Sequence, residues 1–333
     1  MLLWYAARIK AIIFPNLRNF EMIIYKKPKN VTVFPPAKLR PGREAKAETT
    51  VETAMVFTKR GRNGNGLGVV TDARGLDAKK MQKIAKELGF SETSFVFPAD
   101  TPGSDYSVRF FTPKKEIPFA GHPSIGTLFV LLEKRLLRKK EGYVQQIGGR
   151  KVPLRLMADG RISMDQGRPV FGEKIKRAVL ARLLRLDESV VAGDGMVVST
   201  GLPHILAPLS SKNALRNARL SPSVYEKVRK AFKADCVMPF FAEGGAVFCR
   251  NFVPAFGMAE DPATGSGCGP LACYIVRNGK SAAKKDGIFE LEVSQGVGTV
   301  SQLFAWVRAK GGGISGVEVG GYCAMGEKRV VLS

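Results

Sequence analysis

The chain has 333 residues, of which 45% are hydrophobic, and it carries a formal net charge of +23. This length is ample for a packed core and for two domains, and no stretch reaches the apolar length of a transmembrane helix. The charge favours anionic partners. However, the sequence contains no helix-turn-helix, zinc-finger or RNP motif that would give specific nucleic-acid recognition. We therefore expect no membrane partner and no specific nucleic-acid partner.

The cysteine and histidine content argues against a zinc site. The five cysteines are scattered without a C-x-x-C pair, and the only histidines are His122 and His204. Cysteines without a disulfide framework are typical of a reducing compartment. We expect a cytoplasmic protein without a bound metal.

Residues 1–50 differ from the rest of the chain. They contribute +7 to the net charge and contain a Pro- and Lys-rich stretch that is typical of a linker. A transit peptide is one interpretation of this segment, and a start codon placed too far upstream is another. We expect a basic extension outside the fold.

The first expected elements are strands over 52–57 and 67–72, joined by a turn rich in glycine and asparagine. The turn contains GNGLG, which superficially matches a dinucleotide-binding motif. Because a strand rather than a helix follows, we reject a Rossmann fold.

A one-faced helix is predicted next. Within LDAKKMQKIAKELG, Met81, Ile84, Ala85 and Leu88 follow helical spacing. Asp77 and Gly89 are the expected caps. A strand then begins near Glu92, and another ends at Pro113. A helix that is apolar nearly all round follows Pro123, which indicates burial on every side, and a hairpin turns at 159–160.

Two parts of the chain share one design. Arg109 lies in VRFFTP and Arg250 in CRNFVP, and each stretch precedes a glycine-rich turn and an apolar helix. The turns carry His122 and Ser266. This repetition predicts an internal duplication of two lobes. Each helix N-terminus presents free N–H groups to an anion, so a cleft between the lobes would suit a small carboxylate.

Four stretches in order, MQKIAKELGFSETSFVFP, RFFTPKKEIPFAGHPSIGT, FVPAFGMAEDPATGSGCGPLA and VSQGV, resemble the PhzF-like phenazine-biosynthesis family. The resemblance implies an α+β fold like that of diaminopimelate epimerase, with two similar lobes, each a β-barrel-like sheet around a central helix. We divide the chain into 1–50, an N-terminal lobe 51–166 and a C-terminal lobe 167–333, whose last strand is free to return to the first lobe. A homodimer is a further expectation from the family.

The resemblance also implies the chemistry. The family includes trans-2,3-dihydro-3-hydroxyanthranilate isomerase, and it assigns catalytic roles to Glu92, His122, Asp261 and Ser266. A proton moves between two carbons when one carboxylate serves first as base and then as acid. Glu92 is the expected acid/base, and the reaction needs no cofactor.

The glycine-rich turns are the expected substrate-binding segments, through Gly121, Thr264, Gly265 and Gly267. Ala120 and Thr264 occupy the places of the two cysteines of the epimerases, which argues against two-cysteine racemisation. Cys268 and Cys273 are expected to be helix residues.

Several alternatives stay open. Taken singly, Glu92, His122, Asp261 and Ser266 are also typical of turns and helix caps. The fold also suits an isomerase or epimerase acting on another small carboxylate, or a ligand-binding protein without activity. Nucleic-acid binding through the basic surface would instead weaken steeply with salt.

Overall fold

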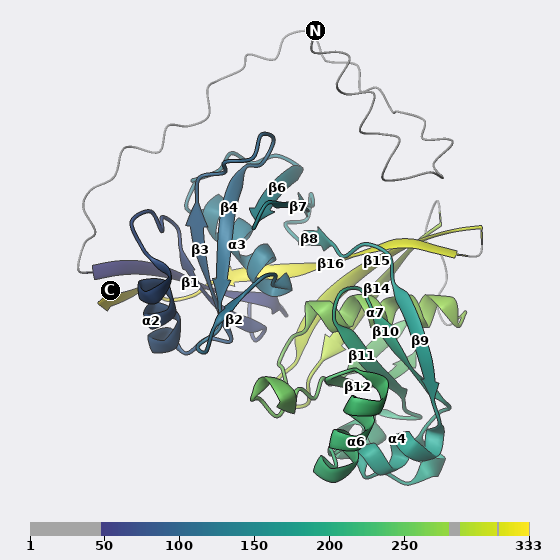
Figure 1. Cartoon of the computed structure of the whole chain (residues 1–333). Coiled ribbons are helices and arrows are strands. Elements are labelled where there is room, and N and C mark those ends of the chain that lie inside the picture. Colours follow the sequence, from purple (N-terminus) through teal and green to yellow (C-terminus); the bar gives the residue numbers. More distant parts are fainter. Residues whose placement is uncertain (1–47, 280–286, 312, 333) are drawn as a thin grey trace, which may run out of the picture. The chain divides into compact units, whose positions relative to one another are not determined.

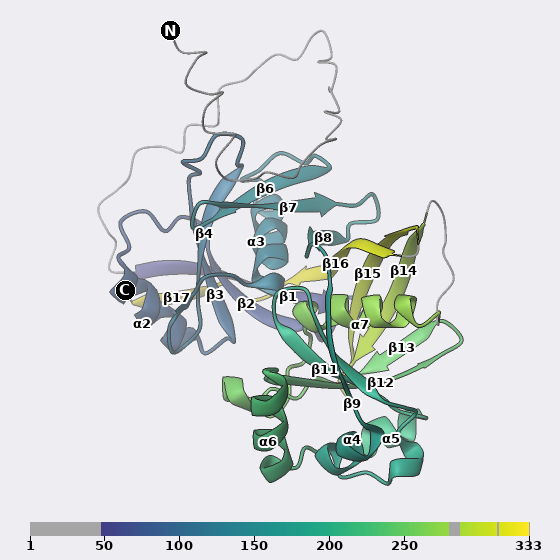
Figure 2. The same cartoon turned by 45° about the vertical axis from the view of Figure 1, so that its right-hand side comes forward.

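The computed structural model describes residues 48–279, 287–311 and 313–332. Of the extension predicted over 1–50, residues 1–47 lie outside these ranges, and residues 48–50 belong to the first strand instead. Figures 1 and 2 show two lobes, each with one helix surrounded by strands.

The N-terminal lobe contains two helices, α2 (Ala78–Leu88) and α3 (Gly121–Glu133). Its strands are β1 (Glu48–Thr58), β2 (Asn65–Val70), β3 (Glu92–Phe97), β4 (Tyr106–Phe111), β5 (Glu116–Ile117), β6 (Gly142–Ile147), β7 (Arg150–Leu156) and β8 (Ile162–Asp165).

The C-terminal lobe contains α4 (Arg177–Leu184), α5 (Lys212–Asn217), α6 (Pro222–Phe232), α7 (Gly265–Arg277) and the 3-10 turns η1 (Glu188–Val190) and η2 (Pro254–Phe256). Its strands are β9 (Val170–Ile175), β10 (Gly195–Ser199), β11 (Pro203–Pro208), β12 (Cys236–Glu243), β13 (Ala246–Cys249), β14 (Ile288–Gln295), β15 (Ser301–Lys310), β16 (Gly313–Met325) and β17 (Arg329–Leu332).

The two lobes repeat one pattern of strand pairing. Along β1-β2-β3-β4-β6-β7-β8, neighbours pair antiparallel, parallel, antiparallel, parallel and then twice antiparallel. The order β10-β11-β12-β13-β14-β15-β16 gives the same pattern. The α+β fold of two similar lobes is therefore confirmed.

β16 joins the lobes. It pairs with β15 in the C-terminal lobe and with β8 and β1 in the N-terminal lobe, and these last two pairings close an eight-stranded barrel. β17 pairs with the beginning of β1. We propose the lobe boundary between β8 and β9, close to residue 166.

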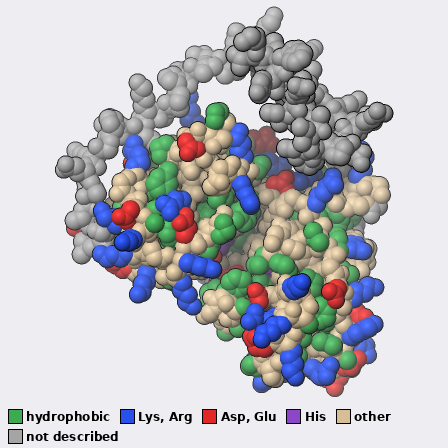
Figure 3. All heavy atoms as spheres, in the orientation of Figure 1, with side chains coloured by type: hydrophobic (Ala, Val, Ile, Leu, Met, Phe, Trp, Pro, Cys, Tyr) green, Lys and Arg blue, Asp and Glu red, His purple; other side chains and the backbone are tan. Residues whose placement is uncertain are grey.

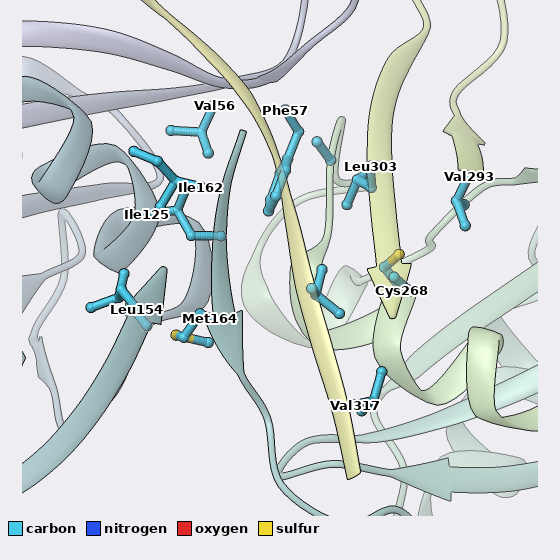
Figure 4. Close-up of a cluster of buried hydrophobic side chains, with 14 of the residues drawn as sticks. Val56, Phe57, Ile125, Leu154, Ile162, Met164, Cys268, Val293, Leu303 and Val317 are labelled. Carbon is cyan, nitrogen blue, oxygen red and sulfur yellow. The ribbon is translucent and has the colours of Figure 1, made fainter. Parts of the chain in front are cut away.

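The central helices are buried as predicted. α3 lies inside the N-terminal barrel, and ten of its thirteen residues are buried. α7 occupies the equivalent place in the second lobe and packs on β15 and β16. Cys268 and Cys273 are helix residues there, as expected. One apolar cluster runs through both lobes, and Figure 4 shows part of it around Val56, Phe57 and Cys268.

The peripheral helices cover the outer faces of the sheets. In α2 the predicted four residues are buried, the Asp77 side chain accepts from Lys80 N, and Gly89 ends the helix in the left-handed region at φ 69°. α2 covers a cluster under β3, β4 and β17. α4, α5 and α6 enclose a second outer cluster on the C-terminal lobe.

Candidate active site

Glu92 and His122 form a pair in the N-terminal lobe, in which His122 is buried and Glu92 is partly buried. Glu92 begins β3, and His122 is the second residue of α3. Glu92 Oε2 lies 3.5 Å from His122 Nε2, and both atoms are buried without a hydrogen-bond partner. Burial lowers the pKa of His122, while the charge of Glu92 and a backbone hydrogen bond at Gly66 oppose this shift. Most buried polar atoms in folded proteins have a hydrogen-bond partner, so these two atoms mark a candidate position for binding polar groups.

Asp261 brings a second carboxyl group from the C-terminal lobe. Its Oδ1 accepts from Asn65 Nδ2 at 2.9 Å, and its Oδ2 accepts from the Thr264 hydroxyl. Burial raises the pKa of Asp261 to about 7, and the charge of Glu92 adds to this increase. The hydrogen bonds from Thr264 and Asn65 act in the opposite direction. The two lobes therefore contribute one carboxyl group each to a common electrostatic environment.

An amide network that sequence reasoning missed holds this second carboxyl group. Thr264 Oγ1 accepts from Asn251 Nδ2 at 2.9 Å and from Gln295 Nε2 at 3.0 Å. Gln295 Nε2 also donates to the Asp261 carbonyl at 2.7 Å. Gln295 belongs to the VSQGV motif and Asn65 to the glycine-rich turn of the sequence, so both positions carried a signal but had no assigned role.

The helix N-termini of the two lobes have equivalent geometry. Ala120 and Thr264 are the N-cap residues of α3 and α7, and Gly121 and Gly265 are the first helical residues. Ser266 follows Gly265 and is partly buried. α3 and α7 also approach each other. The predicted residues of both turns therefore lie at the ends of neighbouring helices.

The glycines of these turns differ in what surrounds them. A Cβ on Gly121 would find its nearest atom, Met164 Cε, at 3.9 Å, whereas a Cβ on Gly267 would overlap Met238 Cε. Gly121 also has no positive φ. Packing therefore disfavours a side chain at 267, where the buried His204 ring also lies 3.0 Å from the Cβ position, while nothing in the described chain requires glycine at 121. The Gly267 N–H donates to Thr264 O at 3.2 Å and is already used inside the helix.

The described ranges contain no group of three or more His, Cys, Asp or Glu side chains placed to hold a metal ion. In the same part of the chain, no helix combines the length and apolar character needed to cross a membrane. Figure 3 shows Lys and Arg side chains spread over both lobes among acidic ones, and the visible face is hollowed between the lobes.

Residues 54–328 match the model of the PhzC-PhzF family, described as phenazine biosynthesis-like proteins. The chain belongs to this family. The PhzC-PhzF assignment covers both lobes and every site residue described above.

Sequence relatives of this family member include isomerases. An uncharacterized isomerase of Clostridium acetobutylicum is 34% identical over 252 residues, which cover 72% of this chain and 83% of the relative. A trans-2,3-dihydro-3-hydroxyanthranilate isomerase of Pseudomonas chlororaphis is 32% identical over 262 residues, covering 78% and 90%. The chain is thus an enzyme of the isomerase or epimerase type.

A solved structure agrees with the fold. The Bacillus anthracis PhzF-family protein superposes with a TM-score of 0.76 at 24% identity, covering 86% of this chain and 99% of that one. At this identity the likeness supports the PhzF-type architecture alone.

Proposed function

We propose that the protein is an isomerase that moves a proton between two carbons of a small cyclic carboxylic acid. The first candidate substrate is trans-2,3-dihydro-3-hydroxyanthranilate, on which a relative 32% identical acts by name. One observation carries the proposal: Glu92 Oε2 and His122 Nε2 are buried, unpartnered and 3.5 Å apart, with Asp261 close enough to feel the charge of Glu92.

Glu92 serves as the base and then as the acid. Its Oε2 removes a proton from one substrate carbon, the electron pair of that C–H bond forms a new double bond, and the former double bond accepts the proton from Oε2 at the other carbon. The composition of the substrate is unchanged, and no cofactor takes part. Positioned acid/base groups of this kind contribute about 10²–10⁴-fold to the rate.

His122 and Asp261 hold the polar groups of the substrate. With a pKa of about 7, Asp261 presents both its protonated and its ionised form near neutral pH. It can therefore donate to or accept from a hydroxyl or amino group. His122, whose pKa burial lowers, is neutral at this pH and faces Glu92. This arrangement keeps the proton of the reaction on Glu92 and the substrate.

The substrate carboxylate binds at the helix N-termini. Gly265 and Ser266 begin α7 and offer backbone N–H groups and one hydroxyl, while Gly121 begins α3. Such termini attract anions through free N–H groups and the helix dipole. The space beside Gly121 supports close approach of a ligand, whereas Gly267 acts through packing.

The test is turnover in D₂O. The purified protein is incubated with trans-2,3-dihydro-3-hydroxyanthranilate, and proton NMR follows substrate loss and deuterium incorporation. We expect turnover by the wild type and a loss of about 10²–10⁴-fold in Glu92→Gln. Equal turnover by both proteins would refute the role of Glu92, and no turnover by either would remove this substrate.

A second candidate is an isomerase or epimerase for another small carboxylate. The uncharacterized isomerase that is 34% identical favours it, because family membership alone does not select the substrate. A panel of small cyclic and amino carboxylic acids in the same D₂O assay separates the two candidates. A homodimer and a cytoplasmic location complete the proposal, and light scattering and cell fractionation test them.

A further inference from the structure

An arginine–glutamate pair holds the segment that leads into α3. Arg109 Nε and Nη2 donate to Glu116 Oε1 and Oε2, each at 2.7 Å. The guanidinium also lies 5.4 Å from the centroid of the Phe111 ring. Glu116 is the Cα partner of Phe111 across β4 and β5. The N-cap Ala120 follows Glu116 by one short segment, so the pair fixes the chain immediately before the turn.

The same device recurs before α7. Arg250 Nε donates to Glu260 Oε1 at 3.0 Å and Nη2 to Oε2 at 2.8 Å, and the guanidinium lies 4.7 Å from the Phe252 ring centroid. Glu260 forms a β-bridge with Phe252, which stands two residues after the arginine, as Phe111 does after Arg109. Asp261 is the next residue. The backbone pairing of glutamate with phenylalanine thus repeats in both lobes, and it is an observation separate from the side-chain contacts.

The connecting segments are of different length, 112–115 in one lobe and 253–259 in the other. In both lobes, however, the glutamate stands at the same distance in sequence from the helix N-cap, Ala120 or Thr264. The loops differ in length, yet the bidentate Arg–Glu fork and its spacing to the helix N-cap are the same in both lobes. The position of the fork relative to the helix is therefore the repeated feature, and the loop is not.

The two pairs differ in burial. The side chains of Arg109 and Glu116 are 37% and 43% exposed, against 9% and 29% for Arg250 and Glu260. Arg250 Nη1 also donates to the carbonyl of Ala218, the C-cap residue of α5, at 2.8 Å. Exposed ion pairs contribute little to stability. Stability therefore does not explain why the N-terminal pair has the same bidentate geometry.

We propose that Arg109–Glu116 and Arg250–Glu260 are matched positioning clamps. The first orients the turn that carries His122, and the second orients Asp261. None of the four clamp residues touches the reacting atoms. The expected effect on turnover rests on the proposed function, but the expected effect on the geometry of the turns does not.

The first test measures turnover of trans-2,3-dihydro-3-hydroxyanthranilate by Glu116→Gln. Because small misplacements of catalytic groups cost up to about 10²-fold, we expect kcat to fall about 10- to 100-fold with a smaller change in KM. Glu226→Gln is the control, since Glu226 is an exposed glutamate on α6 whose two carboxylate oxygens both accept from Arg229 Nε at 3.0 Å. It should behave as the wild type. A Glu116→Gln variant no slower than this control overturns the clamp.

The second test needs no substrate. His122 and His204 are the only histidines, so ¹⁵N-histidine NMR reports each ring separately. If Glu116→Gln loosens the turn, the titration of His122 moves toward the ordinary histidine value while that of buried His204 stays unchanged. An unchanged His122 titration in Glu116→Gln overturns the clamp. When the wild type shows no turnover, the proposed substrate fails, and this NMR result still decides the clamp.

Charge reversal provides a further check on the exposed pair. Arg109→Glu and Glu116→Arg should each perturb the His122 titration, and the double variant should restore it at least in part because the fork can re-form with its partners exchanged. A double variant as perturbed as the single ones overturns the pairing as the cause.

Discussion

Replacing Asp261 by asparagine removes a carboxyl group whose ionisation is unfavourable in the folded protein. Burial raises the pKa of this carboxyl group from an ordinary value of 3.8 to about 7. Between these values the folded chain holds a proton that the unfolded chain has released. The stability of the wild type therefore falls as the pH rises through this window and changes no further above about pH 7. Asparagine has no such titration.

The magnitude follows from the part of the window that is measured. From about pH 5 to the pKa of about 7 there are about 2 pH units, each corresponding to about 1.36 kcal/mol. The upper limit is thus about 3 kcal/mol, and we expect about 1–3 kcal/mol because Asp261 is only partly buried. The lost hydrogen bond from Thr264 destabilises the variant by about 1 kcal/mol at either pH.

The assay is urea unfolding of wild type and Asp261→Asn at about pH 5 and about pH 8. The unfolding free energy of the variant minus that of the wild type should increase by about 1–3 kcal/mol from the lower to the higher pH. At the higher pH the variant should therefore be closer to the wild type in stability, or more stable. A difference in unfolding free energy that stays constant with pH would refute the raised pKa and the role that we assign to this carboxyl group.

Three further predictions concern the turns. Gly121→Ala should keep its melting temperature, because a Cβ has room there, but should raise the KM for the substrate that the proposed function names. Gly267→Ala should lose about 1–3 kcal/mol in urea unfolding through overlap with Met238; equal stability of the two alanine variants would contradict this contrast. Thr264→Val should lose about 1–3 kcal/mol, since its hydroxyl donates to Asp261 and accepts from two amides. An unchanged unfolding midpoint would show that this network does not support the fold.

Local patterns predicted elements of the N-terminal lobe, whereas the resemblance to the PhzF-like family supplied the candidate site residues. The spacing of apolar residues identified α2 and its caps, and the continuous apolar run after Pro123 identified the buried α3. These features depend on residues that are close to one another in the sequence, so the spacing of apolar and capping residues is enough to predict them. The paired arginine motifs likewise indicated two lobes, because a duplication is visible without knowledge of the fold.

Near-neighbour patterns were thus sufficient for elements of the first lobe and for the duplication, and the family motifs indicated the residue types of the site. Which of these residues meet depends on the packing of the two lobes. Asn65 and Asp261 are far apart in the chain, yet β16 joins the two sheets and brings their side chains to 2.9 Å. The pKa of Asp261 depends on burial and on Glu92 from the other lobe. Long-range contacts and local dielectric arise from packing, and no local pattern of residues encodes them.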